Sequence, residues 1–129
     1  MDIVSALFCE TLNVRQAPGP ASRIDLAGVM FSMAAPSAPP VTVAPHLIVL
    51  IRCRPDETGN GVLEVVFRDE AGAEVARNAS PFSVEPGKFT YRLVKGELTY
   101  PALGTIEAHC RVGQGPTTVV PLTLLAPAG

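Results

Sequence analysis

The segment from His46 to Arg54 constrains the fold of this chain more than any other stretch. One histidine precedes five consecutive apolar residues, and charged and apolar residues then alternate as far as Arg54. Successive side chains of a strand point to opposite faces. One face here holds Leu47, Val49, Ile51 and Cys53, and the other holds His46, Ile48, Leu50, Arg52 and Arg54. Because both faces include apolar residues, we predict the central strand of a packed β-sandwich.

Alternation with a period of two residues continues along most of the chain, and no stretch keeps a helical repeat over about 11 residues. Turns rich in glycine, proline and asparagine separate the alternating runs at intervals of about a dozen residues. We therefore predict an all-β fold, an antiparallel, immunoglobulin-like β-sandwich of about seven to nine strands. The length of 129 residues predicts one domain over residues 1–129.

Glycine and proline modify the expected strands at three places. Residues 11–22 contain Pro18, Gly19 and Pro20 and predict a long hairpin loop. Gly28, inside the strand predicted over residues 23–35, indicates a β-bulge or a close backbone approach. Residues 36–45 contain four prolines, which cannot donate to a sheet, and predict an extended crossover between the sheets. The alternative is that they form a ligand for a proline-reading domain.

The charge pattern restricts the partners and the location. The formal net charge is −2 and the sequence has no basic block, so we expect no nucleic-acid partner. No apolar run approaches the roughly 20 residues that span a bilayer. Residues 1–10 lack the basic region and the cleavage site of a signal peptide. We therefore expect a cytoplasmic protein with no membrane partner.

The low charge content has two interpretations. Charged residues make up 17% of the chain, below the usual value of about 25%, and the mean hydropathy is +0.30. One interpretation is a second apolar face that self-association buries. The other is that 13 prolines and 11 glycines displace charged residues from the loops.

The three cysteines, at positions 9, 53 and 110, are predicted to be small buried hydrophobic residues in a reducing compartment. A cysteine nucleophile needs an imidazole within hydrogen-bond reach. His109 and Cys110 are neighbours in a predicted strand, so their side chains point to opposite faces and cannot form a dyad. A pair of His46 with Cys9 or Cys53 stays geometrically open.

The sequence offers little for a metal or a phosphate group. A metal site needs three or four converging ligands, and only two histidines are present. Glu107 and His109 share a strand face, and His46 would be a third ligand if its strand were a neighbour. A solvated polar face explains Glu107 and His109 better. The glycine pairs at positions 59 and 61 and at positions 113 and 115 are not followed by the helix that a phosphate loop requires. We expect no metal, no cofactor and no catalytic residue.

Several short motifs resemble an uncharacterised bacterial family of similar length, a domain of unknown function. They are Ala6-Leu-Phe-Cys-Glu10 with Asn13, Ile24-Asp-Leu-Ala-Gly28-Val-Met-Phe31, and Tyr100-Pro-Ala-Leu-Gly104-Thr-Ile106. The resemblance implies an immunoglobulin-like β-sandwich and transfers no catalytic residue. Many such sequences have tyrosine two residues after the last glycine. Ile106 occupies that position here, so the resemblance implies no tyrosine-corner hydrogen bond from it.

These features predict a non-catalytic interaction or scaffold module that acts through a sheet face or its loops, with a second copy or another protein as partner. The prediction rests on apolar residues at positions expected to face outward, an interaction surface of Ile48, Leu50, Val62, Val66 and Val94. The alternative is a small-molecule-binding β-sandwich, with its ligand between the sheets or near residues 36–45. An enzyme with a cysteine or histidine site ranks third.

Overall fold

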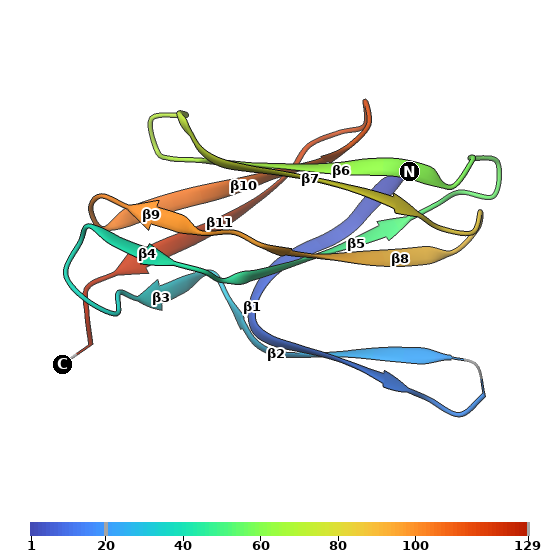
Figure 1. Cartoon of the computed structure of the whole chain (residues 1–129), viewed down its shortest axis with the longest axis horizontal. Coiled ribbons are helices and arrows are strands. Elements are labelled where there is room, and N and C mark those ends of the chain that lie inside the picture. The colour runs from blue at the N-terminus through green and yellow to red at the C-terminus, as the bar shows by residue number, and fades with distance from the viewer. Residues whose placement is uncertain (20, 129) are drawn as a thin grey trace.

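The computed structural model describes residues 1–19 and 21–128, and it confirms the all-β prediction. Two sheets pack face to face (Figure 1). The strands of the described residues are β1 (Asp2–Gln16), β2 (Ser22–Met30), β3 (Ser32–Ala34), β4 (Val41–Val43), β5 (His46–Arg52), β6 (Asn60–Arg68), β7 (Glu74–Ser83), β8 (Phe89–Lys95), β9 (Leu98–Tyr100), β10 (Gly104–Val112) and β11 (Thr118–Leu125). The structure has 11 strands in the described residues, more than the predicted seven to nine. Three of them, β3, β4 and β9, have only three residues each. The described residues contain no helix with the length and apolar character needed to cross a membrane.

The four-stranded sheet, which we call sheet A, has the order β2-β1-β5-β8. The five-stranded sheet, sheet B, has the order β3-β11-β10-β6-β7, and β4 pairs with β9 outside both sheets. The pairing of β3 with β11 is parallel, and the other pairings in the described part of the chain are antiparallel. As predicted, β5 is an interior strand, since it lies between β1 and β8.

The core fills the space between the sheets with alternate residues of the facing strands. The alternation of β5 places Leu47, Val49 and Ile51 inside, as predicted. Sheet B faces them mainly with Leu63, Val65, Phe67, Ile106, Ala108, Leu122 and Leu124. Tyr100 is 2% exposed, and its hydroxyl donates to the carbonyl oxygen of Leu122 at 2.7 Å. Burial raises the pKa of Tyr100 to about 12. The buried tyrosine hydrogen bond therefore comes from position 100 rather than from position 106.

The two halves of the long strand β1 pair with different strands. Residues 2–9 pair with β5, and residues 8–16 pair with β2. Between the two halves, Gly28 has a φ of 67°, and a Cβ there would collide with the side chain of Glu10. The predicted irregularity at Gly28 is thus confirmed. Beyond it, residues 11–16 and 22–27 form a paired hairpin, which we call the arm, and Figure 1 shows it projecting from the sandwich.

The proline-rich segment connects the sheets, as predicted. Residues 36–45 lead from β3 in sheet B to β5 in sheet A. The segment includes β4, whose pairing with β9 keeps it outside both main sheets. Its Pro39-Pro40 peptide bond is cis.

Candidate interaction face

The middle of the face of sheet A that is turned away from the core is mainly aliphatic and aromatic. Because Leu47, Val49 and Ile51 point inward, the alternate residues of β5 point outward. They join β1 and β8 in two cross-strand rows, Leu7–Ile48–Leu93 and Ser5–Leu50–Tyr91. Phe89 lies opposite Arg52 in the next row. We call the following set the apolar face: Leu7, Ile48, Leu50, Phe89, Tyr91 and Leu93.

The side chains of the apolar face differ strongly in exposure. Ile48, at its centre, is only 1% exposed, although it lies outside the core. Leu93 and Phe89, on the edge strand β8, are 44% and 62% exposed. Polar residues occupy the two ends of the face: His46 and Lys95 at one end, Asp2 and Arg52 at the other. The arrangement is an apolar centre with a polar border, as in a protein–protein interface.

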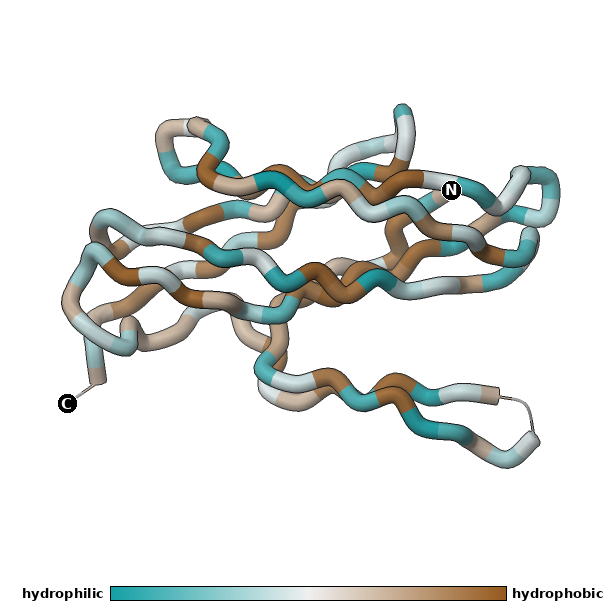
Figure 2. Tube along the Cα trace, in the orientation of Figure 1, coloured by the Kyte–Doolittle hydropathy of each residue, from teal (hydrophilic) through white to brown (hydrophobic). Residues whose placement is uncertain are grey.

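The arm has an apolar side of its own. The cross-strand pairs Leu12–Leu26 and Val14–Ile24 share one side of the hairpin. On the other side, the guanidinium of Arg15 donates from Nε to a carboxylate oxygen of Asp25 at 2.6 Å. In Figure 1 the arm runs on the sheet A side of the sandwich, away from sheet B, and Figure 2 shows hydrophobic residues on both of its strands. Two apolar surfaces therefore lie on the same side of the molecule.

The five residues predicted to form the interaction surface do not lie together. Ile48 and Leu50 belong to the apolar face of sheet A. Val62 and Val66 belong to sheet B, and Val94 is 2% exposed in the core, where it pairs with Leu47. The outward prediction for Val94 was therefore wrong. Strand β8 turns its more apolar set, Phe89, Tyr91 and Leu93, to the outer side, and the alternate set, Thr90, Arg92 and Val94, lies opposite the inward residues of β5.

The outer face of sheet B has charged residues around Val66, and the exposed Val62 and Val119 lie nearer its margins. Val66 is outward there, as predicted, but it is only 5% exposed because it lies between its cross-strand neighbours Arg77 and His109. Arg77 forms ion pairs with Glu64 at 3.0 Å and with Glu74 at 2.7 Å. The Nε2 atom of His109 lies 3.4 Å from a carboxylate oxygen of Glu107. We call this set the charged face: Glu64, Arg68, Glu74, Arg77, Glu107, His109 and Arg111.

The structure separates one cysteine–histidine pair and brings another together. Cys110 lies in the core, where burial raises the pKa of its thiol to about 12, while His109 points outward. Cys9 and His46, the pair left open by the sequence, are cross-strand partners in sheet A. Burial raises the pKa of the Cys9 thiol as well. A thiol held in its protonated form is a weak nucleophile.

The three-ligand metal site considered from the sequence is not formed. His46 lies in sheet A, whereas Glu107 and His109 lie in sheet B, so the three side chains do not lie on neighbouring strands. Within residues 1–19 and 21–128, no three side chains drawn from His, Cys, Asp and Glu are grouped so that they could hold a metal ion.

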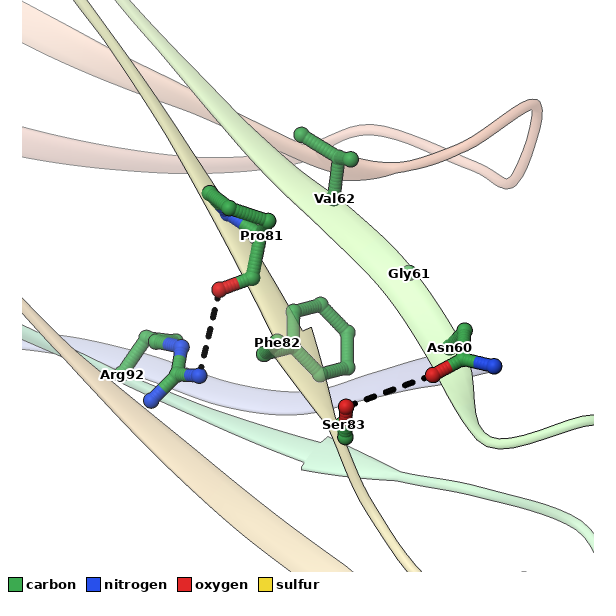
Figure 3. A pocket seen from close by; sticks show the side chains of 7 residues that line it. All are labelled: Asn60, Gly61, Val62, Pro81, Phe82, Ser83 and Arg92. Carbon is green, nitrogen blue, oxygen red and sulfur yellow. Dashed lines mark hydrogen bonds between the residues drawn. The ribbon is translucent and has the colours of Figure 1, made fainter.

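A groove of about 610 Å³ lies at the margin of the sandwich (Figure 3). Its lining residues are Asn60, Gly61, Val62, Pro81, Phe82, Ser83 and Arg92. The guanidinium carbon of Arg92 lies 5.6 Å from the centre of the Phe82 ring, and its Nη2 donates to the carbonyl oxygen of Pro81 at 3.2 Å. The core side chains fill the space between the sheets, so this groove is marginal rather than interior.

Comparison with known proteins adds no relative: no protein-family model matches this chain, and no curated protein matches its sequence. The resemblance to an uncharacterised bacterial family stays a prediction. The functional inference therefore rests on the surfaces described above.

Proposed function

We propose that this protein is a non-catalytic interaction module that forms a homodimer through the apolar face of sheet A and the arm. The main support is the pair of apolar rows outside the core, Leu7–Ile48–Leu93 and Leu50–Tyr91. Contiguous apolar surface of this kind on a small protein marks a place where another surface binds.

The exposed area is large enough to include a surface for a partner. A compact protein of 13.5 kDa is expected to expose about 6,500 Å². This chain exposes 7256 Å². The excess of about 700 Å² is close to the roughly 800 Å² that each partner contributes to a standard interface. The projecting arm explains the excess, because a two-stranded hairpin outside a sandwich exposes both of its sides.

A second copy also provides matching chemistry. The apolar side of one arm, with Leu12, Val14, Ile24 and Leu26, fits the apolar face of a partner's sheet A. Two such contacts related by a twofold axis close the assembly at two copies. Each dimer would then place the polar ends of the face, including His46 and Arg52, at the border of the contact, where water still reaches them.

The thiols support binding rather than catalysis. All three free cysteines are buried, and burial raises the pKa of Cys9 and of Cys110. Reactive cysteines need the opposite environment, one that stabilises the thiolate. We further propose a cytoplasmic location, where thiols that form no disulfide stay reduced.

The test of the dimer is sedimentation equilibrium of the full chain over a wide range of concentration. The variant Leu93→Glu introduces a charge on the apolar face. The matched control is Val119→Glu, because Val119 on sheet B is 45% exposed and Leu93 is 44% exposed. We expect wild type and Val119→Glu to dimerise and Leu93→Glu to stay monomeric with an unchanged circular dichroism spectrum. A wild type that stays monomeric at the highest concentration, or equal behaviour of the two variants, contradicts the proposal.

The marginal groove supports a second candidate, the binding of a small carboxylate ligand. The Nε of Arg92 is buried and has no hydrogen-bond partner, so a ligand carboxylate that accepts from it would satisfy it. Thermal shift with a panel of small carboxylic acids tests this candidate. We expect stabilisation of wild type and of the control Arg77→Met, and none of Arg92→Met. The absence of any stabilisation of wild type would remove this candidate.

A further inference from the structure

Strand β8 is an edge strand of sheet A with one open side. It pairs with β5 on its other side, and within residues 1–19 and 21–128 no strand pairs with the open side. The pairing with β5 includes all seven residues of β8 and has no shift of register. A regular edge strand of this kind has backbone N–H and C=O groups that are free to pair with a further strand.

Alternate residues of β8 point their backbone groups to the open side. The amide of Cys53 donates to the carbonyl oxygen of Lys88 at 2.9 Å, so the carbonyl group of residue 88 points to β5. In an antiparallel pair, this direction alternates from one residue to the next. The backbone groups of residues 90, 92 and 94 therefore point to β5, and those of residues 89, 91 and 93 point to the open side.

The residues with free backbone groups also belong to the apolar face. They are Phe89, Tyr91 and Leu93, whose side chains continue the cross-strand rows of sheet A. A strand added at the open side would form backbone hydrogen bonds with these residues and would place its own side chains beside theirs. Backbone and side chains thus favour the same addition.

The other edge strands of the described residues are less suited to pairing. At the edges of sheet B, β7 contains Pro81, which has no N–H, and β3 has only three residues. At the other edge of sheet A, β2 contains the irregularity at Gly28. Proline, irregular backbone and short length are the usual protections of edge strands. β8 has none of these three within its seven residues.

The sequence of β8 is complementary to a second, antiparallel copy of itself. When Tyr91 lies opposite Tyr91 of the second copy, Phe89 lies opposite Leu93, and each of these pairs can exchange two backbone hydrogen bonds. Cross-strand pairs with aromatic side chains are stabilising. Arg92, which donates to the carbonyl oxygen of Pro81 in sheet B, then lies opposite Thr90. A register shifted by two residues would lose one of the pairs, and in one direction it would set Arg92 opposite Arg92.

We propose that two copies of the chain pair β8 with β8 in this register, which joins their four-stranded sheets into one continuous sheet. The pairing rests on the proposed dimer, because a single pair of strands is only marginally stable in water. Its twofold axis is perpendicular to the sheet, whereas the axis of the face contact lies between the two faces. Two dimers can therefore close into an assembly of four copies.

Amide hydrogen exchange, followed by NMR on the full wild-type chain, tests the pairing at each residue. At a concentration where the chain is monomeric, residues 90, 92 and 94 should exchange at least about tenfold more slowly than residues 89, 91 and 93, because only the first set bonds to β5. As the protein associates, exchange at residues 89, 91 and 93 should slow by about tenfold or more.

Two substitutions of Tyr91 separate its backbone from its side chain. Tyr91→Ala and Tyr91→Pro both remove the aromatic ring from the apolar face, but only proline also removes the N–H on the open side. Proline is tolerated on an edge strand where that N–H faces away from the sheet. In sedimentation equilibrium, the association of dimers into four copies should be weaker for Tyr91→Pro than for Tyr91→Ala by about tenfold or more, the effect of about 1.4 kcal/mol from lost backbone hydrogen bonds.

The results distinguish the strand pairing from the face contact. Fast exchange at residues 89, 91 and 93 in a protein that sedimentation shows to be dimeric or larger would overturn the strand pairing and leave the face contact intact. A wild type that stays monomeric at the highest concentration would overturn both. Equal association of Tyr91→Pro and Tyr91→Ala would also overturn the strand pairing. Circular dichroism checks the fold of both variants, and the exchange of the wild type decides if the proline variant does not fold.

Discussion

The two outer faces of this sandwich cover a central aliphatic residue by different means. Ile48 on sheet A is 1% exposed and lies between Leu7 and Leu93. Val66 on sheet B is 5% exposed and lies between Arg77 and His109. The cover of Val66 includes the Arg77 guanidinium, which is charged and exposed to water, whereas the cover of Ile48 ends in methyl groups. Equal burial of the central residue therefore leaves one face suited to water and the other suited to a partner.

The difference comes from whether the covering side chain ends in a polar group. Arginine packs its methylene groups along an apolar surface and keeps its guanidinium in water. On sheet B, the ion pairs of Arg77 with Glu64 and Glu74 hold its side chain over the strands. Leucine has no such polar end, so Leu93 leaves 44% of its surface exposed without a partner.

The largest expected effect comes from truncation of the two central residues. Ile48→Ala should cost about 2–4 kcal/mol in the free energy of unfolding, because its neighbours on a regular sheet cannot fill the space. Val66→Ala should cost less, about 1–2 kcal/mol, since it removes fewer carbons and the flexible Arg77 side chain relaxes toward the gap. Urea unfolding at a concentration where the protein is monomeric measures both. Equal losses would mean that both faces are closed in the same way.

A smaller effect is expected from changes at Arg77. Arg77→Met keeps an apolar stem over Val66 and removes the charge, whereas Arg77→Ala removes both. We expect Arg77→Ala to be less stable than Arg77→Met by roughly 0.5–1 kcal/mol, because exposed ion pairs contribute little and the stem provides the cover. Urea midpoints of the two variants give the comparison. If the variants are equally stable, the stem of Arg77 does not protect Val66.

The smallest effect is a dependence of the charged face on acid. The hydrogen bond and the charge of Arg77 lower the pKa of the Glu74 carboxyl from its ordinary value of 4.5. A carboxyl whose pKa is lower in the folded protein stabilises the fold above its ordinary pKa, and this contribution is lost as the pH falls through the folded value. The urea midpoint of wild type should therefore fall more steeply below pH 4.5 than that of Arg77→Met. NMR titration of Glu74 should show its pKa rising in that variant, and an unchanged pKa would contradict the role of Arg77.

The sequence predicts the fold better than it predicts the surfaces. The alternation of residues 46–52 identifies β5 and its inward residues, because the central strand of a sandwich needs apolar residues on both sides. The same argument fails for β8. Its alternation separates Phe89, Tyr91 and Leu93 from Thr90, Arg92 and Val94, and the period favours the more apolar set as the inner one. The structure turns that set outward and buries Val94, because a period shows which residues share a face but not which face is inside.

The arm differs from the sequence prediction for a local reason. Proline and glycine in residues 11–22 predict a loop, but β1 extends to Gln16 because Leu12 and Val14 pair with residues of β2.

If a partner covers sheet A and water covers sheet B, the two faces should differ in their access to solvent as the protein associates. Methyl NMR of the wild-type protein with a soluble paramagnetic gadolinium chelate measures this difference, because relaxation enhancement reports the access of solvent to each methyl group. At low concentration, the methyl groups of Leu93 and Val119 should be similarly accessible. As the concentration rises, we expect the enhancement at Leu93 to fall while that at Val119 stays constant. Equal enhancement at both residues over the whole concentration range would contradict it.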